Sequence, residues 1–296
     1  MLPAELTEEL RYLELAVSRR IRSQRFGQSP SRLRGSGYEF ESHRRYEIGE
    51  DLRRVDWNVS ARMQDLFLKR HFEEKEIVVF LVADVSRSMN FSTSKWSKRM
   101  RTMQVAATLG FSATADNCHL GFIAFSDRIE AFEPPRKGQG QVWRIVDRLY
   151  NLPDTQHGTD VGQAVRFLQG RLRRMAIVFL LSDFILDGET RQLTDMPELK
   201  ALARKHDVVP IVFEDDLETS LPSGQGLVRF RAAEGAGEIL IRLSPGHRAR
   251  FAALVERRKV ALRDLFFSLG MEGLFLPVAE PYMDPLMKLF ERRKKG

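Results

Sequence analysis

The chain has 296 residues, 43% of them hydrophobic and 29% charged, with a formal net charge of +7, so it has the composition of a globular protein and disorder is excluded as the default. A single cysteine, Cys118, excludes an internal disulfide and a cysteine-based metal cluster. The first fourteen residues lack the apolar core of a signal peptide and the longest apolar runs have seven residues, against roughly 20 for a membrane span, so we expect a soluble, cytoplasmic protein.

The positive charge is concentrated in two places. Six arginines occur between Arg19 and Arg34 without one acidic residue, and the tail Arg292–Lys295 is also basic. Such stretches are either a surface for nucleic acid or anionic lipid, or simply solvated faces. No interleaved aromatic residues and no recognised nucleic-acid motif accompany them. We therefore favour solvated faces and disfavour nucleic acid as a partner.

The amino-terminal part, residues 1–76, differs from the rest in its sequence pattern. Residues 4–25 predict an amphipathic helix, because Leu6, Leu10 and Leu13 recur at helical spacing. Glycine, serine and proline then mark a linker over 27–37. Residues 38–76 are rich in charge and aromatics and are expected to be irregular. We expect Trp57 to anchor this segment on the sheet that follows.

Residues 77–296 alternate apolar runs with amphipathic stretches. Ile77–Ala83, His119–Phe125, Met175–Leu181, Val208–Phe213 and Leu274–Leu276 predict buried strands, with a short extended piece near Arg128–Phe132. Helices are predicted over 97–116, 141–150, 160–172, 190–205, 246–269 and 281–293. A β-hairpin is predicted as an insertion at about 217–243. This order predicts an α/β fold with a mostly parallel central sheet, plus an amino-terminal helical and irregular extension.

Oxygen-bearing side chains follow the predicted strands. Asp84, Ser86 and Ser88 come after Ile77–Ala83, Asp183 comes after Met175–Leu181, and Thr159 precedes the helix at Asp160. Each fragment alone could be a turn or a helix cap. Ligands of parallel sheets bind at the carboxyl ends of the strands, so these residues are expected to converge. Two carboxylates and three hydroxyls suit a hard cation, and two buried carboxylates without one would repel.

These five positions resemble the metal-ion-dependent adhesion site of von Willebrand factor A-type (vWA) domains, complete as Asp84-x-Ser86-x-Ser88, Thr159 and Asp183. The resemblance implies a Rossmann-like three-layer sandwich over about 77–296. It implies that the five residues hold Mg²⁺, with Mn²⁺ or Ca²⁺ as alternatives, directly or through water. It also implies that one coordination position stays open for an acidic residue of a partner.

A second set of motifs resembles a bacterial family catalogued as domain of unknown function 58. The motifs are Gly37-Tyr38-Glu39-Phe40-Glu41, Arg44–Trp57, Ser60-Ala61-Arg62 and Arg70-His71-Phe72-Glu73-Glu74. Glu50 and Val55 depart from the usual Asp and Ile of that pattern. We interpret most of these residues as structural, with Asp51 and Asp56 pairing with neighbouring arginines to hold the segment in place. The family resemblance implies a cytoplasmic adaptor of a MoxR-type AAA+ ATPase that acts in protein assembly or activation.

The sequence thus favours a non-enzymatic, metal-dependent protein-binding module over two alternatives. A metal-dependent phosphoesterase would use Asp84 and Asp183, but two-metal hydrolases need more carboxylates than this set offers. His119, His157 and His206 lack partners at catalytic spacing, and we interpret them as surface or cap residues. A binder of nucleic acid or anionic surfaces would act through the basic stretches. The sequence is silent on the partner's identity, the pathway, the oligomeric state and the occupancy of the metal site.

Overall fold

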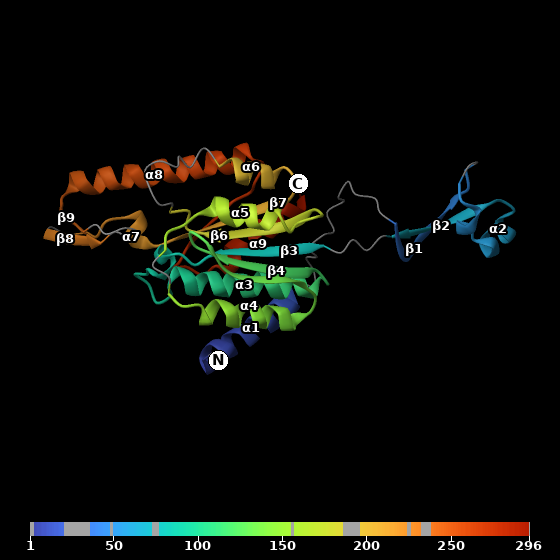
Figure 1. The fold of residues 1–296 in the computed structure, drawn as a ribbon, viewed down its shortest axis with the longest axis horizontal. Helices are drawn as coiled ribbons and strands as arrows, with labels where there is room; N and C mark the ends of the chain where they lie inside the picture. Colours follow the sequence, from blue (N-terminus) through green and yellow to red (C-terminus); the bar gives the residue numbers. More distant parts are fainter. Residues whose placement is uncertain are drawn as a thin grey trace. The chain divides into compact units, whose positions relative to one another are not determined.

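The computed structural model describes residues 3–20, 36–47, 50–72, 77–154, 157–185, 196–223, 226–231 and 238–295. The chain divides into two compact units, one made of residues 1–26 with 77–296 and the other of residues 27–76. Figure 1 shows the elements of both units coloured along the sequence.

A six-stranded sheet forms the centre of the larger unit, with the strand order β10-β7-β6-β3-β4-β5. Its strands are β3 (Val78–Asp84), β4 (His119–Phe125), β5 (Ile129–Arg136), β6 (Ala176–Ser182), β7 (Asp207–Glu214) and β10 (Leu274–Pro277). All neighbours pair in parallel except β4 and β5, which are antiparallel. Because β3 lies between β6 and β4, the strand order reverses there, and such a switch point is where parallel sheets bind ligands.

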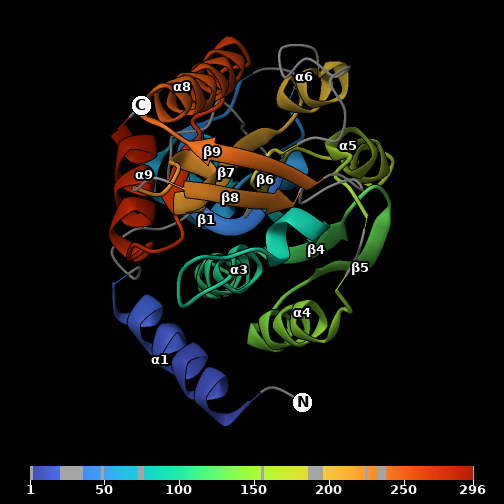
Figure 2. The same ribbon diagram turned by 90° about the vertical axis from the view of Figure 1, so that its left-hand side faces the viewer.

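Helices cover both faces of this sheet, which confirms the predicted three-layer α/β architecture (Figure 2). One face carries α1 (Ala4–Arg20), α3 (Lys98–Ala115), α4 (Gln139–Asn151) and α9 (Met283–Lys295), and the other carries α5 (Val161–Gln169), α6 (Pro197–Ala203) and α8 (Pro245–Ser268). Two short helices, η3 (Arg87–Asn90) and α7 (Asp216–Thr219), follow strands β3 and β7. The predicted hairpin is present as β8 (Gly226–Arg231) paired antiparallel with β9 (Glu238–Leu243).

Helix α1 belongs to the larger unit, so residues 1–76 do not form one segment as expected. Leu6, Leu10 and Leu13 are buried in the same core cluster as α3. Glu9 on α1 also accepts a hydrogen bond from Gln104 of α3 at 2.6 Å. The apolar stripe of α1 is therefore covered by α3, which its sequence pattern alone could not indicate.

The smaller unit is more regular than the sequence predicted. Strands β1 (Ser36–Arg45) and β2 (Phe67–Phe72) pair antiparallel, with η2 (Leu52–Arg54) and α2 (Trp57–Met63) between them. For the described residues of 38–76 the expectation of irregular structure was wrong, because charged residues within both strands hide the apolar alternation on which strand prediction depends.

Asp56, rather than Trp57, is the buried anchor of this small unit. Trp57 is 63% exposed, so it does not pack in the interior of this unit. Asp56 is buried, accepts hydrogen bonds from the backbone N–H groups of Asn58 and Val59, and lies 2.9 Å from His43 Nε2. The predicted structural role of the acidic residues therefore holds at Asp56, which caps α2.

The two basic stretches differ in what the structure describes. Residues 21–34 of the arginine-rich stretch lie outside the described residues. In the tail, Arg292 pairs with Glu272 at 3.1 Å and Arg293 pairs with Asp207 of β7. Both tail arginines are therefore engaged within the protein, which weakens the interpretation of the tail as a nucleic-acid surface.

Gly121 of β4 permits the close approach of a buried aromatic ring. A Cβ atom at this position would lie 2.5 Å from Cε1 of Phe80, its neighbour on β3. We expect Gly121→Ala to lower the free energy of unfolding by about 1–3 kcal/mol, because the ring is enclosed and has little room to shift. Gly140→Ala is the matched control, since a Cβ there meets nothing within 4 Å. Chemical denaturation of both variants tests this, and equal stability of the two would contradict it.

Candidate metal centre

Four of the five predicted metal ligands lie on two loops at the carboxyl ends of adjacent strands. Asp84 ends β3, Ser86 follows it as the residue before η3, and Ser88 lies within η3. Asp183 directly follows β6, the parallel neighbour of β3. All four are 0% exposed. The strand register thus positions the two carboxylates side by side, as the sequence predicted.

The loop after β3 is held by Asp84. Its Oδ1 accepts the N–H of Ser86 at 2.9 Å, and its Oδ2 accepts the hydroxyl of Ser182 at 2.6 Å. The hydroxyls of Ser86 and Ser88 lie 3.1 Å apart. Met89 fills the apolar core behind this loop. Asp84 therefore turns the chain so that both serine hydroxyls lie close to its own carboxylate.

Thr159 is brought to the same edge by two backbone hydrogen bonds. The N–H of Arg87 donates to His157 O at 3.0 Å, and the N–H of Asp160 donates to Ser126 O at 2.9 Å. Residues 157–160 are thus attached both to the loop after β3 and to the end of β4. Thr159 is 6% exposed and lies in this attached segment, at the same edge as the other four candidate ligands.

Asp183 is positioned by an unusual backbone conformation in the residue that follows it. Phe184 has φ of +54°, a left-handed value that costs non-glycine residues of order 1 kcal/mol. Its buried ring packs edge-on against Phe266 of α8 at 5.4 Å, which holds this conformation. The N–H of Ile185 then donates to Asp183 Oδ1 at 2.9 Å. Strain of this kind is common where function fixes a side chain.

The electrostatics of this edge favour a cation. Burial and the negative charge of Asp183 raise the pKa of Asp84 from 3.8 to about 7, against the opposing hydrogen bonds from Ser182 and Ser86. Ionised carboxylates at such a position repel each other unless a positive charge lies between them. Carboxylate and hydroxyl oxygens are the donors that Mg²⁺ and Ca²⁺ select, so the residues present fit a hard divalent cation.

Three further residues contact these ligands, a fourth contacts one of the three, and none was predicted from the sequence. Ser182 donates to Asp84, and Arg258 of α8 donates to the backbone oxygen of Asp183. Lys98, the first residue of α3, lies 2.5 Å from both Asp183 Oδ2 and Glu218 Oε1 of α7. Ser182 could have been found, because it immediately precedes Asp183 at the strand end. Lys98, Glu218 and Arg258 come from distant parts of the chain and leave no local signal.

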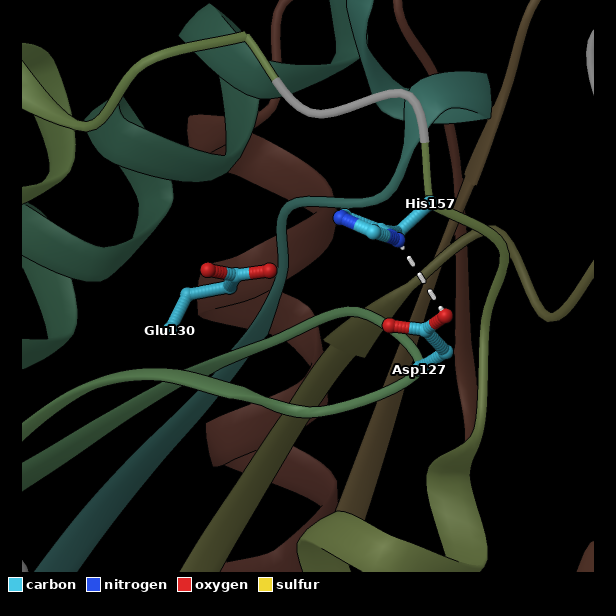
Figure 3. A group of neighbouring side chains, drawn as sticks. All are labelled: Asp127, Glu130 and His157. Atoms are coloured by element: carbon cyan, nitrogen blue, oxygen red, sulfur yellow. Dashed lines mark ion pairs between the residues drawn. The ribbon is translucent and has the colours of Figure 1, made fainter.

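A second cluster with metal-binding potential lies at the exposed end of β4. Ligand atoms of Asp127, Glu130 and His157 lie within 4.8 Å of one another (Figure 3). The expectation that His157 lacks a partner was wrong, since its Nδ1 is 3.3 Å from Asp127 Oδ2. Glu130 already accepts from Ser126 at 2.7 Å and from Arg128 at 3.0 Å. This cluster is satisfied by its own contacts and is more exposed than the Asp84–Asp183 edge.

Among the described residues, no helix combines the length and the apolar character that crossing a membrane requires.

Comparison with known proteins identifies a matching family and several distantly similar proteins. Residues 42–261 match the family model described as "Protein of unknown function DUF58". Uncharacterized proteins of Mycobacterium bovis and Mycobacterium tuberculosis (strain H37Rv) are each 25% identical over 294 residues, which cover 99% of this chain and 91% of the relative.

Two solved structures are distantly similar to this chain. A conserved hypothetical protein, BatB, from Bacteroides thetaiotaomicron is 17% identical with a TM-score of 0.45, covering 74% of this chain and 98% of its own. The SpRpn10 VWA domain is 10% identical with a TM-score of 0.41, covering 72% of this chain and 94% of its own.

Proposed function

The chain belongs to the DUF58 family, and we propose that it is a non-enzymatic protein-binding module whose binding depends on a divalent cation. Asp84, Ser86, Ser88, Thr159 and Asp183 would hold the cation, with Mg²⁺ first and Mn²⁺ or Ca²⁺ as alternatives. When bound, the cation would offer a coordination position to a carboxylate of a partner protein.

One observation carries this proposal: two fully buried carboxylates, Asp84 and Asp183, end adjacent parallel strands beside three buried hydroxyls. Burying like charges is costly, and the single ammonium of Lys98 lies against Asp183, so the two carboxylates together still favour a recruited cation. The protein's own residues have three tasks here. Asp84 sets the loop after β3, Phe184 orients Asp183, and the bond between Arg87 and His157 keeps Thr159 at the edge.

The partner that the family resemblance favours is a MoxR-type AAA+ ATPase, or a client of that ATPase, in the cytoplasm. A cation with only two protein carboxylates keeps positive charge, and an acidic side chain of the partner would neutralise it. Recognition of this kind predicts binding that disappears when the metal is removed.

Capture of a MoxR-type ATPase from the same genome tests this proposal. We expect the full chain to retain the ATPase in Mg²⁺ and to release it in EDTA. Ser88→Ala should weaken capture by about 10–100-fold, because it removes a candidate ligand. Ser112→Ala is the control, since Ser112 is also buried but lies at the far end of α3. Equal capture in Mg²⁺, in EDTA and by Ser88→Ala would overturn the proposal.

A metal-dependent phosphoesterase is the second candidate, and the pair of His157 and Asp127 is the observation that favours it. We call the sheet edge formed by Asp84, Ser86, Ser88, Thr159 and Asp183 the metal edge. His157 and Asp127 could exchange protons beside it, because His157 lies two residues before Thr159. Turnover of p-nitrophenyl phosphate in Mg²⁺ or Mn²⁺ that His157→Ala abolishes would establish an enzyme. Absence of turnover with metal bound would leave the binding module.

A further inference from the structure

Lys98 is a completely buried lysine at the candidate metal edge. Its ammonium lies 2.5 Å from Asp183 Oδ2 and 2.5 Å from Glu218 Oε1. The side chains of Lys98 and Asp183 are both 0% exposed, and that of Glu218 is 17% exposed. The lysine therefore connects a candidate metal ligand on the loop after β6 to helix α7.

Two features make this position unfavourable for a lysine: its burial and its place at the start of a helix. Taking an ammonium out of water costs several kcal/mol before any partner compensates. Lys98 is also the first residue of α3, where the helix dipole disfavours positive charge. Its favourable interactions are with the carboxylates of Asp183 and Glu218, so its place in the fold depends on the negative charge of the metal edge.

Lys98 and a divalent cation would draw on the same carboxylate. Asp183 Oδ1 accepts the N–H of Ile185, and Asp183 Oδ2 accepts from Lys98. A cation at this edge must therefore share Asp183 with the ammonium or displace it. Glu218 holds the ammonium from the other side, and this contact decides how much of the lysine's charge acts on Asp183.

We propose that Lys98 is a built-in counter-cation that neutralises Asp183 in the absence of metal and competes with the divalent cation for it. Glu218 tunes this competition by holding part of the ammonium's charge. The inference rests on the proposed metal-binding function, and it makes Lys98 a residue that lowers the affinity of the site. Binding of metal is thereby weakened until a partner's carboxylate joins the cation.

Isothermal titration of Mg²⁺ into metal-free protein tests the inference. Lys98→Met keeps the length of the side chain and removes the charge, and we expect it to bind Mg²⁺ about tenfold more tightly than the wild type. Lys259→Met is the matched control, because Lys259 pairs at 3.0 Å with Glu214, which is not a candidate metal ligand. We also expect Lys98→Met to unfold at a lower temperature in EDTA and to gain more from Mg²⁺ than the wild type.

Glu218→Gln gives a prediction of opposite sign that holds even when Lys98→Met does not fold. Without Glu218 the ammonium acts on Asp183 alone, so Mg²⁺ binding should weaken by about fivefold or more. Glu214→Gln removes the same charge from the neighbouring pair with Lys259 and should change the affinity little. Equal weakening by Glu218→Gln and Glu214→Gln would overturn the inference, because it would indicate a general effect of charge.

The outcomes also separate this inference from the proposed function. Equal affinity of the wild type and folded Lys98→Met overturns the inference and leaves the metal site in place. Binding by Lys98→Met alone supports both the inference and the metal site, because the ammonium then keeps the cation out of the wild type until a partner's carboxylate joins it. Absence of binding in both overturns both.

Discussion

Asp84→Asn is expected to abolish saturable Mg²⁺ binding, raising the dissociation constant by more than about 100-fold. The variant removes the charge of a fully buried carboxylate that ends β3 and keeps its size. Its Oδ1 can still accept the N–H of Ser86, so the loop should stay folded. Titration calorimetry measures the affinity, and circular dichroism verifies the fold.

The same variant should be at least as stable as the wild type when metal is absent. Burial and the charge of Asp183 raise the pKa of Asp84 to about 7, so this group is protonated more easily in the folded chain than in the unfolded chain. The wild type therefore loses stability as pH rises from about 3.8 to about 7, whereas asparagine has no charge to bury. At pH 8 in EDTA we expect Asp84→Asn to gain about 1–3 kcal/mol.

Asp127→Asn is the control for this experiment. Asp127 belongs to the exposed cluster with Glu130 and His157, the other group among the described residues with geometry suited to a metal. Its substitution should leave Mg²⁺ affinity unchanged. Loss of Mg²⁺ binding in Asp127→Asn with retention in Asp84→Asn would move the metal site to the exposed cluster.

The larger unit follows from its sequence because local signals and tertiary packing agree there. The apolar runs Ile77–Ala83 and Met175–Leu181 become the adjacent central strands β3 and β6, within one residue of the expected bounds. Residues that follow adjacent parallel strands must meet at one edge, so Asp84 and Asp183 could be brought together without coordinates.

The contacts around the ligands could not be predicted, because they join residues far apart in the chain. Lys98 and Asp183 are 85 residues apart, and Lys98 and Glu218 are 120 apart. Nothing in the sequence beside Lys98 marks it as buried, since a lysine in the first turn of a helix is ordinarily solvated. The strand order and the antiparallel pairing of β5 are likewise set by packing across the sheet.

The small unit was missed for a different reason. Strands β1 and β2 contain several charged residues, and a two-stranded ribbon has little apolar core to impose alternation. Trp57 is exposed in this unit, although large aromatic side chains are usually buried. Here the buried contact is made by Asp56, whose carboxylate caps α2 and pairs with His43.

Asp215 is a buried carboxylate that supports the metal edge and is not itself a candidate ligand. It directly follows β7 and is 1% exposed. Its Oδ2 accepts the N–H of Thr93 at 2.9 Å, and its Oδ1 accepts the hydroxyl of Thr93 at 2.6 Å and the N–H of Leu217 at 3.1 Å. Asp215 thus fastens helix α7 to the loop that precedes α3.

We expect Asp215→Ala to lower the free energy of unfolding by about 2–4 kcal/mol, because three donors lose a buried charged acceptor. Asp216→Ala is the matched control, since Asp216 is the exposed neighbour and its loss should cost only about 0.5 kcal/mol. Urea denaturation in EDTA measures both values without any contribution from metal. Equal stability of the two variants would contradict the role of Asp215 in holding α7.

Loosening α7 should also change metal binding, because this helix carries Glu218. When Glu218 moves away, Lys98 is left with Asp183, and the ammonium competes more strongly with the cation. At a temperature where Asp215→Ala remains folded, we therefore expect its Mg²⁺ affinity to fall in the same direction as that of Glu218→Gln. Combining the two substitutions should weaken binding little beyond Glu218→Gln alone, because both act through the same contact. Additive losses would mean that Asp215 influences the metal edge by a route that does not pass through Lys98.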